Sequence, residues 1–335
     1  MSKVLKAMMV CLLTLVSLAA VLPARAGQVE IRVGYENHPG EPVDLFCIEW
    51  KRLVEERSKG TMSIQLFPSS QLGSKNDIMD QMIAGDSVIT LADGAFFADR
   101  GVPDYSITFA PYLFATWDDA WRLFASDWHK EQMDKLEKLG LKVLVWNGIY
   151  GVRHTLTTRP VRRVDDLKGM KIRVPNNTMQ IVGFDVLGAT PTPLPLGEVY
   201  TALQQRVIEG VENPLTVLYN GKFHEVAKFL TLDGHIRNNV NWVSGTIFFN
   251  SLTPEQQNIL IDSGVEANET INIVAEKANE DAIQLFKDAG VEIIEVDVTE
   301  FQKAAIGAYT DPRVAARWTP GLGDRVRGII AGTGK

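Results

Sequence analysis

The sequence is poor in the residues and patterns that most enzymes with recognisable motifs need. It contains two cysteines, Cys11 and Cys47, so neither a disulfide framework nor a four-thiolate zinc site can be built. Its five histidines are scattered, and no two are spaced as a helical metal-binding pair. No dinucleotide fingerprint, phosphate-binding loop or nucleophile elbow is present. We therefore expect no bound metal and no cofactor.

Basic residues are outnumbered by acidic ones. The 335 residues include 34 Lys and Arg against 41 Asp and Glu, which gives a formal charge of −7. No cluster of Lys and Arg offsets this balance, so we expect no nucleic-acid partner. The composition, 45% hydrophobic and 22% charged, is that of an ordinary globular protein with enough apolar material for more than one core.

Long apolar runs are missing except at the N-terminus. Lys3 and Lys6 precede the uncharged stretch 7–22, and Ala24-x-Ala26 follows it, which is the pattern of a secretory signal peptide cleaved after Ala26. The run is short for a membrane span, which needs about 20 apolar residues. A buried N-terminal helix is the alternative. We expect export to the periplasm, where the single remaining cysteine would be a buried apolar residue.

The first half of the chain alternates strand and helix patterns. Residues 28–35 alternate as a strand, and a helix opens at Glu41-Pro42. The same rhythm continues with strands at 62–67, 87–92 and 142–146 and with helices at 75–84, 117–124 and 128–139. This β-α-β-α-β order predicts an α/β sheet.

A second α/β unit follows without a long linker. Strand patterns at 153–157, 171–174 and 207–211 are interleaved with helical patterns at 178–187 and 197–205, and the proline-rich 190–195 must be extended. Strand crossings between the two units would act as a hinge. Thr253 caps a helix that reaches about residue 289, which would be roughly 55 Å long if Gly264 does not break it.

Several motifs in a fixed order resemble one family. The stretches DLKGMKIRVP, LGATPTPLP, EVYTALQ and ENP, within residues 166–214, are similar to those of the extracytoplasmic solute receptors of tripartite ATP-independent periplasmic (TRAP) transporters, the DctP family. The resemblance extends over most of the chain after the signal peptide. It implies a two-lobed α/β periplasmic binding protein that closes over a carboxylate-bearing solute, with hinge strands and a long helix spanning both lobes, and it implies no catalysis.

The resemblance also implies how the chain is divided and what it meets. Residues 1–26 would be the signal peptide, 27–150 with about 239–278 lobe I, and 151–238 with about 279–335 lobe II. The lobes would close about strands near 150–154 and 237–242. The expected partners are a small organic acid and the membrane permease subunits of a TRAP transporter, and the receptor is expected to be a monomer.

Three site residues follow from the family motifs. The arginine of I-R-x-P is Arg173, a second arginine twenty residues earlier is Arg153, and the asparagine of E-N-P is Asn213. A guanidinium can present two parallel N–H donors to one carboxylate, which lysine cannot do. Without the motif, a structural ion pair with an acidic residue would be the more common role for Arg173.

Four further residues are predicted on the lobe I side of the cleft. Asn37 and His38 follow the first strand, Asp93 ends the third, and Lys75 opens a helix. The carboxyl ends of strands in open α/β sheets bind ligands. The alternatives are a turn-forming aspartate before Gly94 and a solvated lysine.

These polar groups opposite an arginine favour a hydroxylated acid, so a sugar acid such as a uronate, aldonate or keto-aldonate is the preferred ligand class. A C4-dicarboxylate is the main alternative, followed by aromatic or branched keto acids. A periplasmic enzyme using His38 and Asp93 as an acid–base pair is a remote alternative, because no nucleophile stands beside a base. A non-binding scaffold protein of the cell envelope is a third class and would show an exposed apolar patch instead of a pocket.

Overall fold

A computed structural model describes residues 28–333, and the predicted signal peptide lies outside them. Within this range one mixed nine-stranded sheet runs through the molecule, in the order β2-β1-β3-β8-β4-β7-β5-β6, with β9 paired to β8. The strands are β1 (Val29–Gly34), β2 (Met62–Phe67), β3 (Val88–Ala92), β4 (Leu141–Thr157), β5 (Lys171–Val174), β6 (Thr190–Pro193), β7 (Gly210–Pro214), β8 (Phe229–Gly245) and β9 (Glu292–Ile294).

The two ends of the sheet form the lobes of a two-lobed α/β protein, as the alternating pattern predicts. At one end β1 pairs in parallel with β2 and β3. At the other end β5 pairs in parallel with β6 and β7. Parallel strands require crossover connections, and the helices between these strands supply them.

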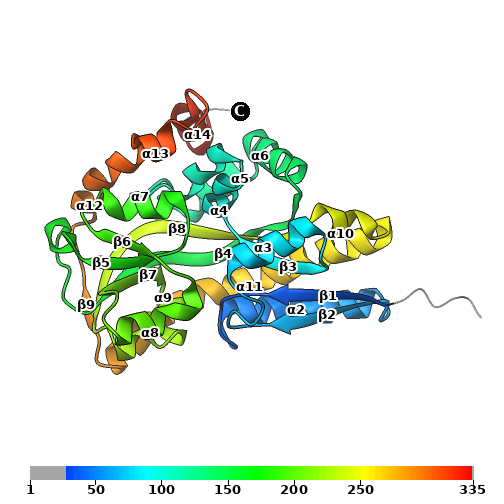
Figure 1. The fold of residues 1–335 in the computed structure, drawn as a ribbon, viewed down its shortest axis with the longest axis horizontal. Helices are drawn as coiled ribbons and strands as arrows, with labels where there is room; N and C mark the ends of the chain where they lie inside the picture. Colours follow the sequence, from blue (N-terminus) through cyan, green and yellow to red (C-terminus); the bar gives the residue numbers. More distant parts are fainter. Residues whose placement is uncertain (1–27, 334–335) are drawn as a thin grey trace, which may run out of the picture.

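The strands β4 and β8 join the two lobes. Each has 17 residues, they pair antiparallel along their length, and Figure 1 shows them crossing the whole molecule. The sequence predicts two short strands, 142–146 and 153–157, where β4 is continuous. The reason is a set of register shifts around Gly148 and Gly151, which break the alternating pattern while the backbone stays extended. Gly151 has a φ of 135°, which favours glycine.

Helices cover both faces of the sheet, with α7 and α12 to α14 on one side of it in Figure 1 and α8, α9 and α11 on the other. The α-helices are α2 (Pro42–Arg57), α3 (Lys75–Ala84), α4 (Gly94–Asp99), α5 (Trp117–Phe124), α6 (Asp127–Lys138), α7 (Thr178–Asp185), α8 (Val199–Gln204), α9 (Leu215–Asn220), α10 (Thr246–Ser251), α11 (Pro254–Asp288), α12 (Val298–Ala305), α13 (Pro312–Ala315) and α14 (Leu322–Ile330). Short 3-10 helices are η1 (Pro103–Phe109), η2 (Val164–Leu167), η3 (Leu196–Glu198), η4 (Phe223–Glu225) and η5 (Ile306–Tyr309).

The long helix α11 is continuous through Gly264. Its Thr253 cap and Gln256 form the predicted capping box. Gly264 lies where α11 crosses the sheet, and a Cβ there would stand 2.4 Å from Val145 and 3.1 Å from the Trp50 indole nitrogen. The glycine therefore permits close packing instead of breaking the helix. Because α11 contacts α2 in lobe I, α9 and β9 in lobe II, and the joining strand β4, it spans both lobes.

Candidate functional site

A cavity lies over the middle of β4 and β8, between the lobes. It holds about 370 Å³ of space not filled by protein atoms, part of which is open to solvent. Its lining comes from the ends of β3, β5 and β7, from the β1–α2 and β5–α7 loops, from α3 and α4, and from the two joining strands. Polar residues dominate it: Glu36, Lys75, Asp93, Tyr150, Arg153, Arg173, Asn213, Asn238 and Asn239.

Arg173 presents an unpaired positive charge to this cavity. It lies on β5 between the buried residues Ile172 and Val174, and its own side chain is 2% exposed. Its Nε donates to the Leu194 carbonyl at 2.8 Å, but Nη1 has no hydrogen-bond partner and no ion pair to Arg173 occurs within residues 28–333. Burial lowers the pKa of this guanidinium to about 10. A buried cation of this kind requires an anion.

Arg153 is in the opposite situation, although it lines the same cavity. Its Nε and Nη2 donate to the two carboxylate oxygens of Glu212 at 2.5 and 2.7 Å, and its Nη1 donates to Asn238 Oδ1 at 2.8 Å. Arg153 is 3% exposed and Glu212 is completely buried. The charge of Arg153 is therefore neutralised inside the protein, and its bidentate geometry fixes the guanidinium at the cavity wall.

Glu212 belongs to a larger buried network that leads away from the cavity. His235 Nε2 lies 3.1 Å from Glu212, and its Nδ1 lies 3.1 Å from Asp233. Burial alone would lower the pKa of His235, but the charges and hydrogen bonds of the two carboxylates raise it to about 9. A charged His235 with Arg153 balances Glu212 and Asp233, so the network is neutral as a whole.

Asn213 and Asp93 face the cavity from opposite lobes. Asn213, next to Glu212 on β7, is buried and its Oδ1 has no hydrogen-bond partner within the described residues. Asp93 caps α4 by accepting from the Ala95 amide at 3.0 Å, and burial raises the pKa of its carboxyl despite the nearby charges of Lys75 and Arg153. Asp93 thus combines the helix-capping role with a place in the cavity wall.

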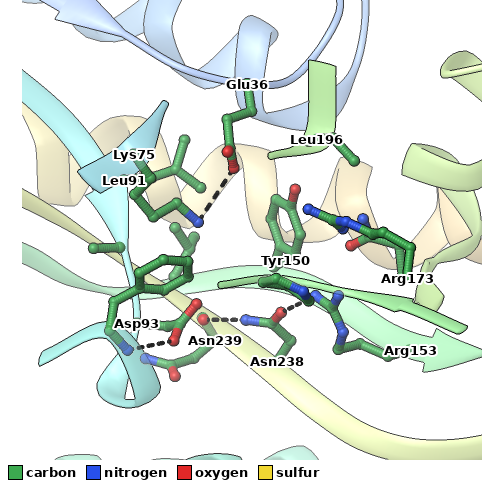
Figure 2. A pocket seen from close by; sticks show the side chains of 15 residues that line it. Glu36, Lys75, Leu91, Asp93, Tyr150, Arg153, Arg173, Leu196, Asn238 and Asn239 are labelled. Carbon is green, nitrogen blue, oxygen red and sulfur yellow. Dashed lines mark hydrogen bonds and ion pairs between the residues drawn. The ribbon is translucent and has the colours of Figure 1, made fainter. Parts of the chain in front are cut away.

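Lys75 opens α3 and forms an ion pair with Glu36, whose Oε2 lies 3.4 Å from Nζ. Both side chains are nearly buried, and the Lys75 ammonium also lies 4.5 Å from the centre of the Phe96 ring. Figure 2 shows the pair on the side of the cavity opposite Arg173. Lys75 is therefore nearly buried and paired, in contrast to the solvated lysine that the sequence also allows.

The structure brings Arg173, Arg153, Asn213, Asp93 and Lys75 together but does not bring Asn37 and His38 to the cavity. The Asn37 amide does not line the cavity and donates to Glu41 and to the Tyr150 hydroxyl. The His38 ring lies 3.0 Å from Ser69 Oγ. The loop that follows β1 instead places Glu36 in the cavity wall.

The sequence does not predict the other polar residues that line the cavity. Asn238 and Asn239 lie on β8, whose alternation is interrupted by polar and glycine residues, so no strand was predicted there apart from a hinge at 237–242. The sequence predicts Tyr150 near the hinge but does not predict it in the site. Within residues 28–333 no helix is long and apolar enough to cross a membrane, and no three His, Cys, Asp or Glu residues gather as metal ligands would.

The chain is similar to proteins that bind organic acids. The family model of bacterial extracellular solute-binding proteins, family 7, matches residues 33–315. The 2,3-diketo-L-gulonate-binding periplasmic protein of Escherichia coli K12 is 33% identical over 284 residues, which cover 84% of this chain and 86% of that protein.

Two solved structures of TRAP periplasmic solute-binding proteins resemble it throughout. One, from Ochrobacterium anthropi with bound L-fuconate, is 40% identical with a TM-score of 0.88 and covers 91% of this chain and 100% of its own. The other, from Actinobacillus succinogenes 130z with bound L-galactonate, is 38% identical with a TM-score of 0.87 and has the same coverage.

Proposed function

Because this chain belongs to the bacterial extracellular solute-binding proteins of family 7, the DctP family of TRAP solute receptors, we propose that its cavity captures a sugar acid. Members of this family are receptors and not enzymes. The proposed ligand carries one carboxylate and several hydroxyls, as an aldonate, uronate or keto-aldonate does.

The unpaired Arg173 guanidinium is the observation that carries this proposal. Its free Nη1 faces a cavity that also holds the unpartnered Oδ1 of Asn213. A ligand carboxylate would pair with the cation, and a hydroxyl next to it would donate to the asparagine oxygen. Arg153 is already neutralised by Glu212, so a single carboxylate suffices to balance the charge of the two arginines.

The opposite side of the cavity favours hydroxyls over a second carboxylate. Asp93 and Glu36 line it with acidic oxygens, and Lys75 is already engaged with Glu36. A C4-dicarboxylate would bring its second charge toward these acids, which like-charge repulsion disfavours. Sugar hydroxyls can donate to the same oxygens. The sugar acids bound by the two similar structures are consistent with this choice.

Delivery of the ligand to the membrane permease of a TRAP transporter completes the proposal. The receptor would act in the periplasm after cleavage behind Ala26, as a monomer whose lobes are residues 27–150 with about 239–278 and residues 151–238 with about 279–335. The contact of α14 with α5 suggests that the C-terminal helix also touches lobe I.

A thermal-shift screen tests the ligand class. The exported chain would be heated with L-fuconate, L-galactonate, galacturonate, succinate and malate, each at the same concentration. A ligand at 100 times its dissociation constant stabilises by about 2.7 kcal/mol, a shift of a few degrees. We expect the largest shifts from the sugar acids. If succinate or malate shifts the melting temperature most, the sugar-acid proposal is wrong and the dicarboxylate alternative takes its place.

A further inference from the structure

The loop between β1 and α2 holds a buried carboxylate behind the cavity wall. Glu41 is 1% exposed; its Oε1 accepts from the His38 amide at 2.8 Å and its Oε2 from Asn37 Nδ2 at 2.7 Å. Pro42 at the start of α2 keeps Glu41 extended, with φ −69° and ψ 156°. An ionised carboxylate only accepts hydrogen bonds, so the Asn37 amide must turn its NH₂ group toward Glu41.

This orientation determines what the Tyr150 hydroxyl can do. Asn37 Nδ2 lies 3.1 Å from Tyr150 Oη, within the usual range for N–H···O bonds. Asn37 Oδ1 lies 3.4 Å from the same hydroxyl, beyond the usual range for O–H···O bonds. The hydroxyl therefore accepts from Asn37 and keeps its own proton for another acceptor. Figure 2 shows this hydroxyl directed into the cavity.

We propose that Glu41 and Asn37 are positioning residues that make Tyr150 a hydrogen-bond donor to the carboxylate of the bound acid, next to Arg173. This inference rests on the proposed function, because it requires an acid in the cavity. Tyr150 and Arg173 line the same cavity and are close enough to interact electrostatically. Burial raises the pKa of Tyr150 well above its usual value, so the hydroxyl retains its proton. The Pro-Gly-Glu-Pro loop, residues 39–42, thereby acquires a role in ligand recognition.

An isosteric change at Glu41 reverses the polarity of this hydroxyl. In Glu41→Gln the amide oxygen must still accept from the His38 backbone, which cannot rotate, so the new NH₂ faces Asn37. Two NH₂ groups 2.7 Å apart repel, and the Asn37 amide can relieve this by turning its oxygen toward residue 41. That oxygen then also faces Tyr150, whose hydroxyl donates to it and presents lone pairs to the ligand carboxylate.

Calorimetric titration of L-fuconate into five proteins tests the inference: the wild type, Glu41→Gln, Tyr150→Phe, the double variant and the surface control Glu49→Gln. The control makes the same chemical change on the exposed side of α2, where Glu49 pairs with Arg52. We expect Glu41→Gln and Tyr150→Phe each to weaken binding about tenfold or more, since a hydrogen bond to a charged group is lost. The double variant should bind no more weakly than Tyr150→Phe, and the control should bind as the wild type.

Each other result counts against the inference or against its premise. Wild-type affinity in Tyr150→Phe overturns the inference, and so do losses that multiply in the double variant. If Glu41→Gln does not fold, as judged by its melting curve, Tyr150→Phe alone decides. A wild type that binds no acid in the panel overturns the proposed function, and the inference with it, whereas wild-type binding with indifferent variants overturns the inference alone.

Discussion

Two buried arginines twenty residues apart differ in what balances their charge. Arg153 is paired with Glu212, whereas Arg173 has no ion pair within residues 28–333. We expect Arg173→Lys to weaken binding of L-fuconate by well over tenfold, because a lysine cannot form the bidentate pair and truncated buried pairs cost about 2–5 kcal/mol. The melting temperature without ligand should stay close to that of the wild type, since Arg173 takes part in no ion pair within the described residues. Calorimetry and a melting curve measure both, and undiminished affinity would remove Arg173 from the site.

The matching change at the paired arginine should act mainly on stability. Arg153→Leu leaves Glu212 without its main partner in a fully buried position. Removing one partner of a buried ion pair typically costs about 3–5 kcal/mol. Urea unfolding should therefore show a much lower free energy of unfolding for Arg153→Leu than for Arg173→Lys. Equal stability of the two variants would mean that the Glu212 network does not hold Arg153 as described.

Acidification should weaken ligand binding through Glu41. Burial raises the pKa of Glu41 to about 7, with a further contribution from Asp44. Protonated Glu41 can donate to Asn37, which turns the amide as Glu41→Gln does, so affinity should fall as the pH drops from 8 to 6. The other titratable or charged groups near this contact are Asp44, His38, Tyr150, Glu36 and Arg153.

Titrations of L-fuconate at pH 8 and pH 6 measure this effect. The Glu41→Gln variant should bind weakly at both pH values and lose the pH dependence. A dependence of equal size in the variant would assign it to another group, such as the Asp93 carboxyl, whose pKa burial also raises.

At the scale of elements, much of the framework could be predicted, whereas the two joining strands could be predicted only in parts. The capping box at Thr253 and the helical pattern from Lys75 are local signals, and both helices begin where these signals place them. Only residues 237–242 of β8 are predicted as strand, because Asp233-Gly234 and the adjacent asparagines interrupt its alternation. These interruptions are where the strand serves the buried network and the cavity instead of the core.

The site residues likewise fall into those that the sequence predicts and those that it does not. Arg173, Arg153 and Asn213 follow motifs, and Asp93 and Lys75 follow from the ends of a strand and the start of a helix. Glu36 could not be selected, because which residue of the β1–α2 loop lines the cavity depends on the hydrogen bonds within that loop. Tyr150 could not be selected, because register shifts interrupt the alternation of β4 around it.

Asn272 links α11 to the strand that forms the cavity floor. Its amide accepts from the Ile149 N–H and donates to the Asn147 carbonyl, both at 2.8 Å, where the register of β4 is shifted. Asn272→Ala leaves two backbone groups without these partners, and we expect the free energy of unfolding to fall by about 1–3 kcal/mol. Asn279→Ala is the control, since Asn279 bonds only the Ala275 carbonyl of its own helix. Similar unfolding curves for the two variants would contradict this role of Asn272.

For the whole molecule, the contacts around the cavity come from both lobes at once. Asp99 at the end of α4 accepts from the Thr178 amide at 2.7 Å at the start of α7, and Arg317 donates to the same carboxylate at 3.0 Å. Gly197 approaches Ser70 across the other side of the cleft. A receptor with such contacts encloses its solute only when the lobes are together, so a ligand that touches both lobes stabilises this arrangement.

In the proposed complex, one ligand carboxylate balances the Arg173 charge. Calorimetric titration of the wild type with L-galactonate, galactitol and succinate tests it most directly, because galactitol replaces the carboxylate of the sugar acid with an alcohol. We predict that L-galactonate binds tightest, that succinate binds at least tenfold more weakly, and that galactitol loses a hundredfold or more, about 2.7 kcal/mol. Comparable affinity for galactitol and L-galactonate would contradict the account, because the unpaired arginine would then contribute nothing to recognition.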